Sequence, residues 1–191
     1  MPADRDHTGI GCPATESPAT PMVGPVLTTD RLTLRPNRLD DFEAYADLMA
    51  SERSVYIGGP FDRQRAWMLF ASDVVQWQFY GHGGMAVVLT RSGTCVGQVA
   101  LNCLPGFPER ELGWMVYADH EGRGYMTEAA HCLKAYAFEI LHWPTLVSYI
   151  SRDNVRSIAL ARRLGGWLDT EAESPKTYDL VFRYRPTEPL P

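Results

Sequence analysis

Residues 121 to 127 form the stretch of the chain best suited to hold a phosphate group. The segment is Glu121-Gly-Arg-Gly-Tyr-Met-Thr127, and it lies between a strand-like apolar run and an amphipathic helical pattern. Glycines at 122 and 124 let the backbone approach an anion, because no Cβ stands in the way. Free N–H groups at the start of the following helix, together with the helix dipole, favour negative charge there. The segment therefore predicts a pyrophosphate site.

The spacing of the glycines separates this segment from two other phosphate-binding loops. A P-loop has the pattern Gly-x-x-x-x-Gly-Lys-Ser/Thr, and a dinucleotide fingerprint has Gly-x-Gly-x-x-Gly after the first strand. Neither pattern occurs in the chain. The segment instead resembles the acetyl-CoA-binding motif of the GNAT N-acetyltransferase superfamily, in the branch typified by the ribosomal-protein acetyltransferases RimJ and RimL. Met126 stands where that motif usually has a small residue.

Two further segments carry the resemblance, which spans about residues 26 to 185. Glu111-Leu-Gly-Trp-Met precedes the glycine loop, and Asn154-Val-Arg-Ser157 opens a helical pattern after it. The resemblance implies the GNAT fold, an α/β (α+β) architecture with a mixed, mostly antiparallel seven-stranded sheet flanked by helices. In that fold the fourth and fifth strands splay apart, and acetyl-CoA enters the gap between them as co-substrate.

The resemblance also implies which residues bind acetyl-CoA. The edge of the fourth strand would pair with the pantetheine arm, and the backbone of the glycine loop would meet the pyrophosphate. Arg123 either adds a cation or faces solvent, and Asn154 holds the pantetheine arm, caps the helix, or does both. The candidate cofactor-binding residues are therefore Trp114, Met115, Val116, Glu121, Gly122, Arg123, Gly124, Tyr125, Met126, Thr127, Asn154 and Ser157.

The implied chemistry is aminolysis of a thioester, in which a neutral amine attacks the acetyl carbonyl and a thiolate leaves. Glu111 is the candidate base, acting directly or through water, because it begins the fourth strand at the family's Glu-x-Gly-aromatic position. The alternative is that Glu111 is a surface carboxylate that pairs with Arg110 or another arginine. Glu109 is a second, less favoured candidate for the base.

The group that protonates the thiolate is less evident from the sequence. Many superfamily members use a tyrosine on the helix after the fifth strand, but Ala161 occupies that place. Ser157 matches the serine of the Asn-x-x-Ser pattern in the RimL-like branch, so it is the candidate that hydrogen-bonds the sulfur. It could instead bond to backbone near the helix start. Other hydroxyls that could reach the cleft belong to Tyr149, Tyr178 and Tyr184.

Hydrophobic periodicity predicts the elements that must position these residues. A half-buried strand is expected over 27–35, and helices are expected after Asp40 or Asp41 and over 63–80. The glycine loop should open a helix over 124–141, and Asn154 should cap one that ends at Leu164. The other expected strands cover 85–90, 94–101, 111–117, 145–150, 167–173 and 177–184.

Composition sets the outer bounds of the protein. A chain of 191 residues with 45% hydrophobic content supports one domain, with residues 1–25 as a disordered leader and 186–191 as a short tail. The leader has no apolar run, so neither a signal peptide nor a membrane span is expected.

The four cysteines and five histidines lack metal-ligand spacing, so we expect free thiols, a cytoplasmic protein and no metal. A net charge of −5 argues against nucleic-acid partners.

Two functions remain open at this stage. One is an N-acetyltransferase that acts on a protein N-terminus, an amino-sugar antibiotic or another small amine, and the other is a catalytically idle acyl-CoA-binding sensor or interaction domain with the same fold. The acceptor pocket should lie between the first two helices, their loop near Tyr56 to Phe61, and the last strands. Homodimers are common in this branch, so a homodimer is a further expectation. Three aromatic residues could line the pocket or belong to the core: Trp67, Trp77 and Phe79.

Overall fold

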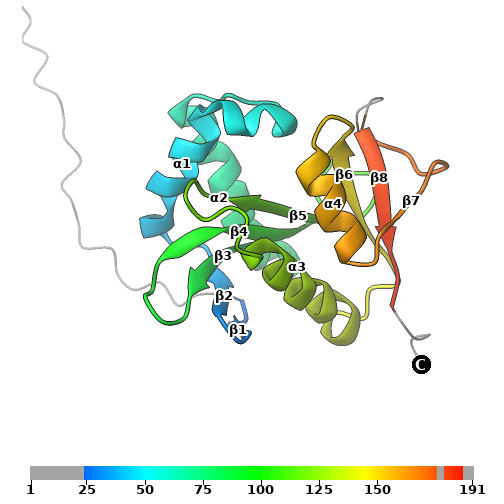
Figure 1. The fold of residues 1–191 in the computed structure, drawn as a ribbon, viewed down its shortest axis with the longest axis horizontal. Coiled ribbons are helices and arrows are strands. Elements are labelled where there is room, and N and C mark those ends of the chain that lie inside the picture. The colour runs from blue at the N-terminus through cyan, green and yellow to red at the C-terminus, as the bar shows by residue number, and fades with distance from the viewer. Residues whose placement is uncertain (1–23, 176–178, 187–191) are drawn as a thin grey trace, which may run out of the picture.

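The computed structural model describes residues 24–175 and 179–186. The predicted leader and tail fall almost entirely outside the described residues, as does Tyr178. The described chain forms one eight-stranded sheet with the order β1-β2-β3-β4-β5-β6-β8-β7 (Figure 1). Every strand pair is antiparallel except β5 with β6. The strands are β1 (Leu27–Thr28), β2 (Leu32–Pro36), β3 (Gly84–Leu89), β4 (Cys95–Asn102), β5 (Glu111–Val116), β6 (Leu146–Ser151), β7 (Trp167–Leu168) and β8 (Asp179–Tyr184).

The mixed, mostly antiparallel sheet confirms the expected fold class, but it has eight strands and not seven. The single strand expected over 27–35 is a hairpin of β1 and β2, with Leu27 opposite Leu34. A turn separates the two strands, because the backbone N–H of Thr29 donates to Leu32 O at 2.9 Å and the Thr29 hydroxyl accepts from Leu32 N–H at 3.1 Å. The alternation of Leu32 and Leu34 that indicated a strand is kept within β2.

The C-terminal strands are also shorter than expected. The strand predicted over 167–173 is wrong beyond Leu168, because β7 pairs only with Arg183 and Phe182 of β8. After β7 the chain turns at Asp169, whose side chain accepts from Glu171 N–H at 3.1 Å and from Arg183 Nε at 2.5 Å. Asp169 N–H still donates to Val181 O at 2.9 Å, and beyond it the Asp169 side chain, not a strand partner, accepts the Glu171 N–H of the turn.

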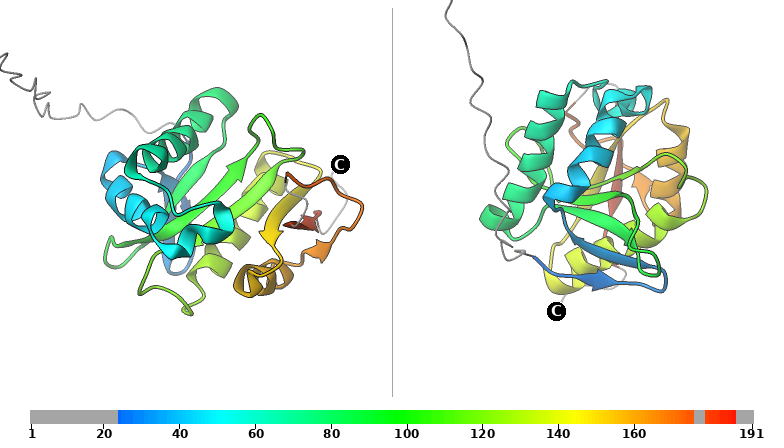
Figure 2. Two further views of the ribbon diagram at one scale, coloured as in Figure 1. Left: turned by 90° about the horizontal axis from the view of Figure 1, so that it is seen from above. Right: turned by 90° about the vertical axis from the view of Figure 1, so that its left-hand side faces the viewer.

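Helices cover both faces of the sheet. Figure 2 shows α1 (Phe42–Ala50) and α2 (Arg63–Tyr80) on one side of the strands and α3 (Tyr125–Ala135) on the other. A π-helical turn, η3 (Tyr136–Ile140), completes the helix predicted over 124–141. The capped helix α4 (Val155–Arg163) follows β6, and two 3₁₀ helices, η1 (Leu39–Asp41) and η2 (Glu52–Ile57), flank α1.

The strands β5 and β6 separate where the site is expected. They pair in parallel at one position, Glu111 with Val147, next to a hydrogen bond from Val147 N–H to Arg110 O of 2.9 Å. Beyond this pair the Ser148 hydroxyl donates to Leu112 O. The rest of β5, toward Val116, has no strand pairing with β6, which is the splay implied by the resemblance.

Candidate active site

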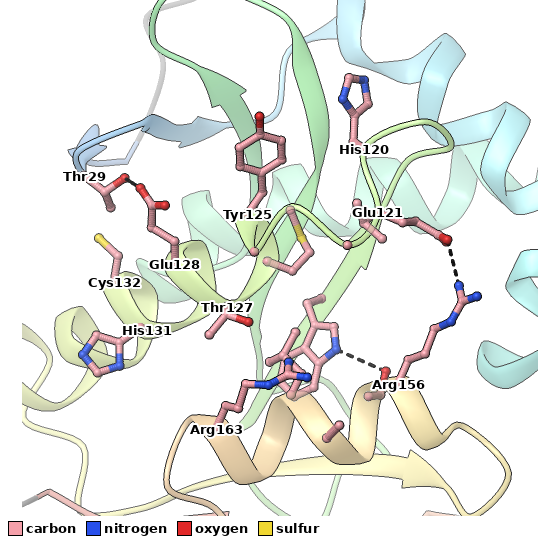
Figure 3. Close-up of a pocket in the computed structure, with 18 of the residues that line it drawn as sticks. Thr29, His120, Glu121, Tyr125, Thr127, Glu128, His131, Cys132, Arg156 and Arg163 are labelled. Carbon is pink, nitrogen blue, oxygen red and sulfur yellow. Dashed lines mark hydrogen bonds and ion pairs between the residues drawn. The ribbon is translucent and has the colours of Figure 1, made fainter.

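A large cavity occupies the opening between β5, α3 and α4. Its volume is about 1290 Å³. Figure 3 shows α3, with Tyr125 and Thr127, on one side and α4, with Arg156 and Arg163, on the other. Trp114 and Val116 of β5 form part of its wall, whereas Met115 points to the other sheet face and packs against the α1–α2 cluster. Met115 therefore does not line this cavity.

The glycine loop has the geometry that an anion site needs. Gly122 and Gly124 have φ of 71° and 78°, a left-handed conformation that favours glycine. A Cβ at Gly122 would have no neighbour within 4 Å, and one at Gly124 would have only Arg31 Nη2, at 3.5 Å. Gly124 is the N-cap of α3 and offers no side chain, so the N–H groups of the first turn stay available. The loop and the cavity beside it therefore suit a pyrophosphate.

Glu121 and Arg123 support the loop in ways that the sequence did not indicate. The Glu121 carboxylate forms ion pairs with Arg53 of η2 and with Arg156 of α4, the latter at 2.8 Å. The hydrogen bond from Arg53 lowers the pKa of Glu121. The exposed Arg123 provides its carbonyl to Arg31 Nη1 at 3.1 Å. Arg53 also donates to Val116 O at 2.9 Å, so one guanidinium ties η2 to both the loop and the β5 edge.

Met126, the departure from the family motif, points into the core. Its side chain is buried and lies over β4, where a Cβ at Gly97 would come within 3.1 Å of Met126 Cε. The missing side chain at position 97 therefore provides the room for the methionine. The loop keeps its open left-handed glycines in spite of the larger residue.

Asn154 and Ser157 meet Trp114 at the start of α4. Asn154 caps the helix, with its Oδ1 accepting from Ser157 N–H at 3.1 Å. The cap uses the amide oxygen and leaves the NH₂ group as a donor, so both alternatives for Asn154 remain compatible with its position. The Ser157 hydroxyl accepts from Trp114 Nε1 at 3.2 Å.

A smaller pocket of about 90 Å³ lies on the opposite side of this contact. Tyr56 and Ile57 of η2 form part of its wall, and Glu111 lies in it together with Tyr149 of β6. Trp114 and Ser157 line both this pocket and the large cavity. The two spaces therefore share a wall, with the candidate base on one side and the glycine loop on the other.

The contacts of the carboxylates distinguish the two candidate bases. Glu111 Oε2 accepts from the neutral amide of Asn102 at 2.9 Å. Arg110 places its guanidinium over the Trp143 ring, 4.5 Å from its centroid. Glu109 forms two hydrogen bonds to Arg183, at 2.6 and 2.7 Å, so its charge is already compensated. Glu111 also lines the small pocket, whereas Glu109 does not, so the position of the two carboxylates favours Glu111 over Glu109.

The remaining hydroxyl candidates are less suitable. Tyr149 lines the small pocket, but burial raises its pKa to about 12, and its oxygen accepts from Glu109 N–H at 3.1 Å. Tyr184 is buried and donates to Ser148. Of the three α2 aromatic residues considered for the acceptor pocket, Trp77 is 3% exposed and belongs to the core, whereas Trp67 and Phe79 are 45% and 75% exposed. None of the three lines either space.

Several polar contacts between α2 and β4 had no recognisable pattern in the sequence. Gln76 of α2 donates to Asn102 at 3.3 Å, which extends the contact of Glu111 into α2. One turn earlier on α2, Asp73 accepts from Gln98 Nε2 at 2.6 Å, and burial raises the pKa of Asp73 to about 7. These contacts join residues 25 or more positions apart, and only the folded chain shows them. Within the described residues no group of three or more metal-ligating side chains occurs, and no helix has the length and apolar character to cross a membrane.

Comparisons with known proteins identify the family of this chain. The Acetyltransferase (GNAT) domain model matches residues 31–166. The crystal structure of an acetyltransferase from Agrobacterium tumefaciens str. C58 is 51% identical over 85% of this chain and 95% of that chain, with a TM-score of 0.83. A putative ribosomal-protein-serine acetyltransferase from Vibrio cholerae is 25% identical over 86% and 99%, with a TM-score of 0.71. RimL, a ribosomal L7/L12 alpha-N-protein acetyltransferase in complex with coenzyme A, shares the fold at 14% identity over 84% and 98%, with a TM-score of 0.68. The chain is therefore an acyltransferase that belongs to the GNAT acetyltransferase family.

Proposed function

We propose that the chain is an acetyl-CoA-dependent N-acetyltransferase of the RimJ/RimL-like branch, which transfers the acetyl group directly to a primary amine in a ternary complex. The observation that carries the proposal is the wall shared by the two spaces. Trp114 and Ser157 separate a cavity beside an anion-binding loop from a pocket that contains a carboxylate. A donor and an acceptor that enter from opposite sides would meet at this wall without a covalent enzyme intermediate.

The donor side suits acetyl-CoA. The pyrophosphate would meet the N–H groups of residues 122 to 127, and each such dipole contact contributes about 0.3–1 kcal/mol when exposed. The pantetheine arm would run along β5 at Trp114 and Val116, which line the large cavity. The Asn154 NH₂ group, which lines the adjoining small pocket, would be a further donor where the two spaces meet. Bound coenzyme A in a protein of the same fold supports this assignment.

On the acceptor side, Glu111 would take the proton that the amine loses. At pH 7 an α-amine is about 17% neutral and a lysine side chain only about 0.04%, so an N-terminal or similarly weak amine needs less help from a base. Glu111 accepts from the Asn102 amide, and Tyr56, Ile57 and Tyr149 line the same pocket. Turnover on peptides, compared with turnover on small amines, would decide whether the acceptor is a protein N-terminus or a small amine.

Release of free coenzyme A tests the proposal. Acetyl-CoA is offered with a panel of small primary amines and peptides with free N-termini, and N-acetylated versions of the same peptides serve as blocked controls. Turnover with at least one free amine and none with its blocked form is expected. Tight binding of acetyl-CoA without turnover on any amine would instead identify an idle acyl-CoA-binding domain.

Two glutamate variants then test the assignment of the base. Glu111→Gln should lower kcat about 100-fold, since general bases contribute roughly 10²–10⁴-fold. Glu109→Gln is the matched control, because it removes a neighbouring carboxylate that is paired with Arg183. It should lower thermal stability while kcat stays close to that of the wild type. The reverse pattern would assign the base to Glu109.

A further inference from the structure

The hydrogen bond between Trp114 and Ser157 has a fixed direction. An indole nitrogen carries a hydrogen and has no lone pair to offer, so Trp114 Nε1 must be the donor. The Ser157 oxygen, 3.2 Å away, must therefore be the acceptor. A serine hydroxyl can accept two hydrogen bonds and donate one, so this contact leaves its own O–H free to donate elsewhere.

The surroundings of Ser157 restrict where that O–H can point. The backbone N–H of Ser157 is bonded to Asn154 Oδ1, which fixes the residue in the first turn of α4. Within residues 24–175 and 179–186, the Ser157 hydroxyl donates to no protein acceptor. The hydrogen of the Ser157 hydroxyl must point away from the indole N–H of Trp114, which the same oxygen accepts. Because Ser157 lines both the donor cavity and the acceptor pocket, the space available to the hydrogen is the place where the two meet.

We propose that Trp114 is a positioning residue that makes Ser157 a hydrogen-bond donor to the sulfur of acetyl-CoA. This inference rests on the proposed function, in which the thioester sulfur lies at the shared wall. Without the indole N–H, the hydroxyl could rotate and donate to a backbone carbonyl of its own helix, as serine does in many helices. The indole N–H disfavours that rotation and keeps the O–H directed into the site.

In the transfer step the amine nitrogen forms a bond to the acetyl carbon, the carbon–sulfur bond breaks, and its electron pair goes to sulfur. Ser157 donates a hydrogen bond to this sulfur as its negative charge develops. Glu111 takes the proton that the amine gives up, and the released thiolate takes a proton from solvent. A hydrogen bond accepted from Trp114 polarises the hydroxyl and strengthens the bond that it donates. The stabilisation acts on the charge that develops on the leaving group, which is where it accelerates the reaction.

The pKa of the bound coenzyme A thiol, followed by its thiolate absorbance, tests the inference without an acceptor or turnover. In the wild-type protein a donated hydrogen bond should lower this pKa below that of free coenzyme A. Ser157→Ala should raise the pKa of the bound thiol by about 1, the size expected for one hydrogen bond to a charged group. Trp114→Phe keeps an aromatic ring and removes the N–H, so it should raise the pKa in the same direction.

Three comparisons decide the outcome. The double variant Trp114→Phe/Ser157→Ala should match Ser157→Ala alone, because the indole acts only through the hydroxyl. Trp77→Phe is the matched control, since it also removes an indole hydrogen bond, the one to Gly84 O at 2.9 Å, and it should leave the thiol pKa at the wild-type value. A Trp114→Phe variant with a wild-type thiol pKa, or additive effects in the double variant, would overturn the positioning role alone. Failure of the wild-type protein to bind coenzyme A would overturn the proposed function as well.

Discussion

At the scale of single residues, the conformation of Gly124 controls the donor site. Its φ of 78° places it in the left-handed region, and it directly precedes the free N–H groups of α3. Gly124→Asp adds both a side chain and a negative charge at this point, so we expect coenzyme A affinity to fall at least about 100-fold. Isothermal titration with coenzyme A measures the change. Gly93→Asp is the matched control, because Gly93 has a φ of 72° in the β3–β4 turn. Equal losses in both variants would contradict the anion site.

Asp73 provides a second prediction at this scale. Burial raises its pKa from 3.8 to about 7, so between these pH values the folded state binds more protons than the unfolded state. Stability must then fall as the pH rises through this window. Asp73→Asn keeps an oxygen for Gln98 and removes the charge. Its free energy of unfolding should fall less between about pH 4 and about pH 8, by on the order of 3–4 kcal/mol.

Urea unfolding at several pH values measures this difference. Asp47→Asn is the control, because Asp47 is an exposed carboxylate on α1. Its pH dependence should follow the wild type. A wild-type curve for Asp73→Asn would show that the Asp73 carboxyl is ionised in the folded protein at lower pH than its surroundings indicate.

At the scale of elements, η2 connects the two halves of the site. Its N-cap Ser51 accepts from Arg53 N–H at 3.3 Å, and the buried Ser54 hydroxyl donates to Met49 O at 2.9 Å, so the short helix is held firmly against α1. From this support η2 places Tyr56 and Ile57 in the acceptor pocket and Arg53 against Glu121 of the glycine loop. A change on one side of the cleft can therefore affect the other.

Arg53→Ala tests this connection. The substitution removes the hydrogen bond to Val116 O and one of the two cations beside Glu121, which leaves more negative charge near the pyrophosphate. We expect coenzyme A affinity to fall about 3- to 10-fold, the scale of a partly exposed ion pair. Arg63→Ala, which breaks the fully exposed pair with Glu43, should leave the affinity unchanged in the same titration. Similar values for both variants would show that η2 is not coupled to the donor loop.

The elements also show what could be predicted from the sequence. The helix start at the glycine loop, the cap at Asn154 and the splayed strands were predicted correctly, because each depends on neighbouring residues or on the family pattern. The break at Thr29 was missed, since the alternation of Leu32 and Leu34 does not depend on where the strand begins. The contacts of Glu111 with Asn102 and of Arg53 with Glu121 bring together distant segments, and no local pattern encodes them. The position of Met126 in the core could not be predicted from the loop alone either, because it depends on Gly97 in another strand.

At the scale of the whole molecule, the described residues contain one continuous sheet with its site and both hydrophobic clusters. The main cluster extends from Leu32 of β2 to Tyr184 of β8, and the second joins α1 and α2 to β5. Gly24 already packs against this body, since a Cβ there would lie 2.9 Å from the Trp77 ring. Residues 24–186 should therefore carry the complete folding unit and the donor site.

A chain of residues 24–186 is the test of this unit. Its melting temperature without ligand should stay within about 2 °C of that of the full chain, because none of the described packing is removed. Acetyl-CoA at about 100 times its dissociation constant should add about 2.7 kcal/mol of stability, or roughly 5–10 °C, to both chains. Gly124→Asp, made in the shorter chain, should lose the ligand-induced shift and keep the ligand-free melting temperature within a few degrees. A shorter chain that melts much earlier, or that no longer binds acetyl-CoA, would show that the folding unit extends beyond residues 24–186.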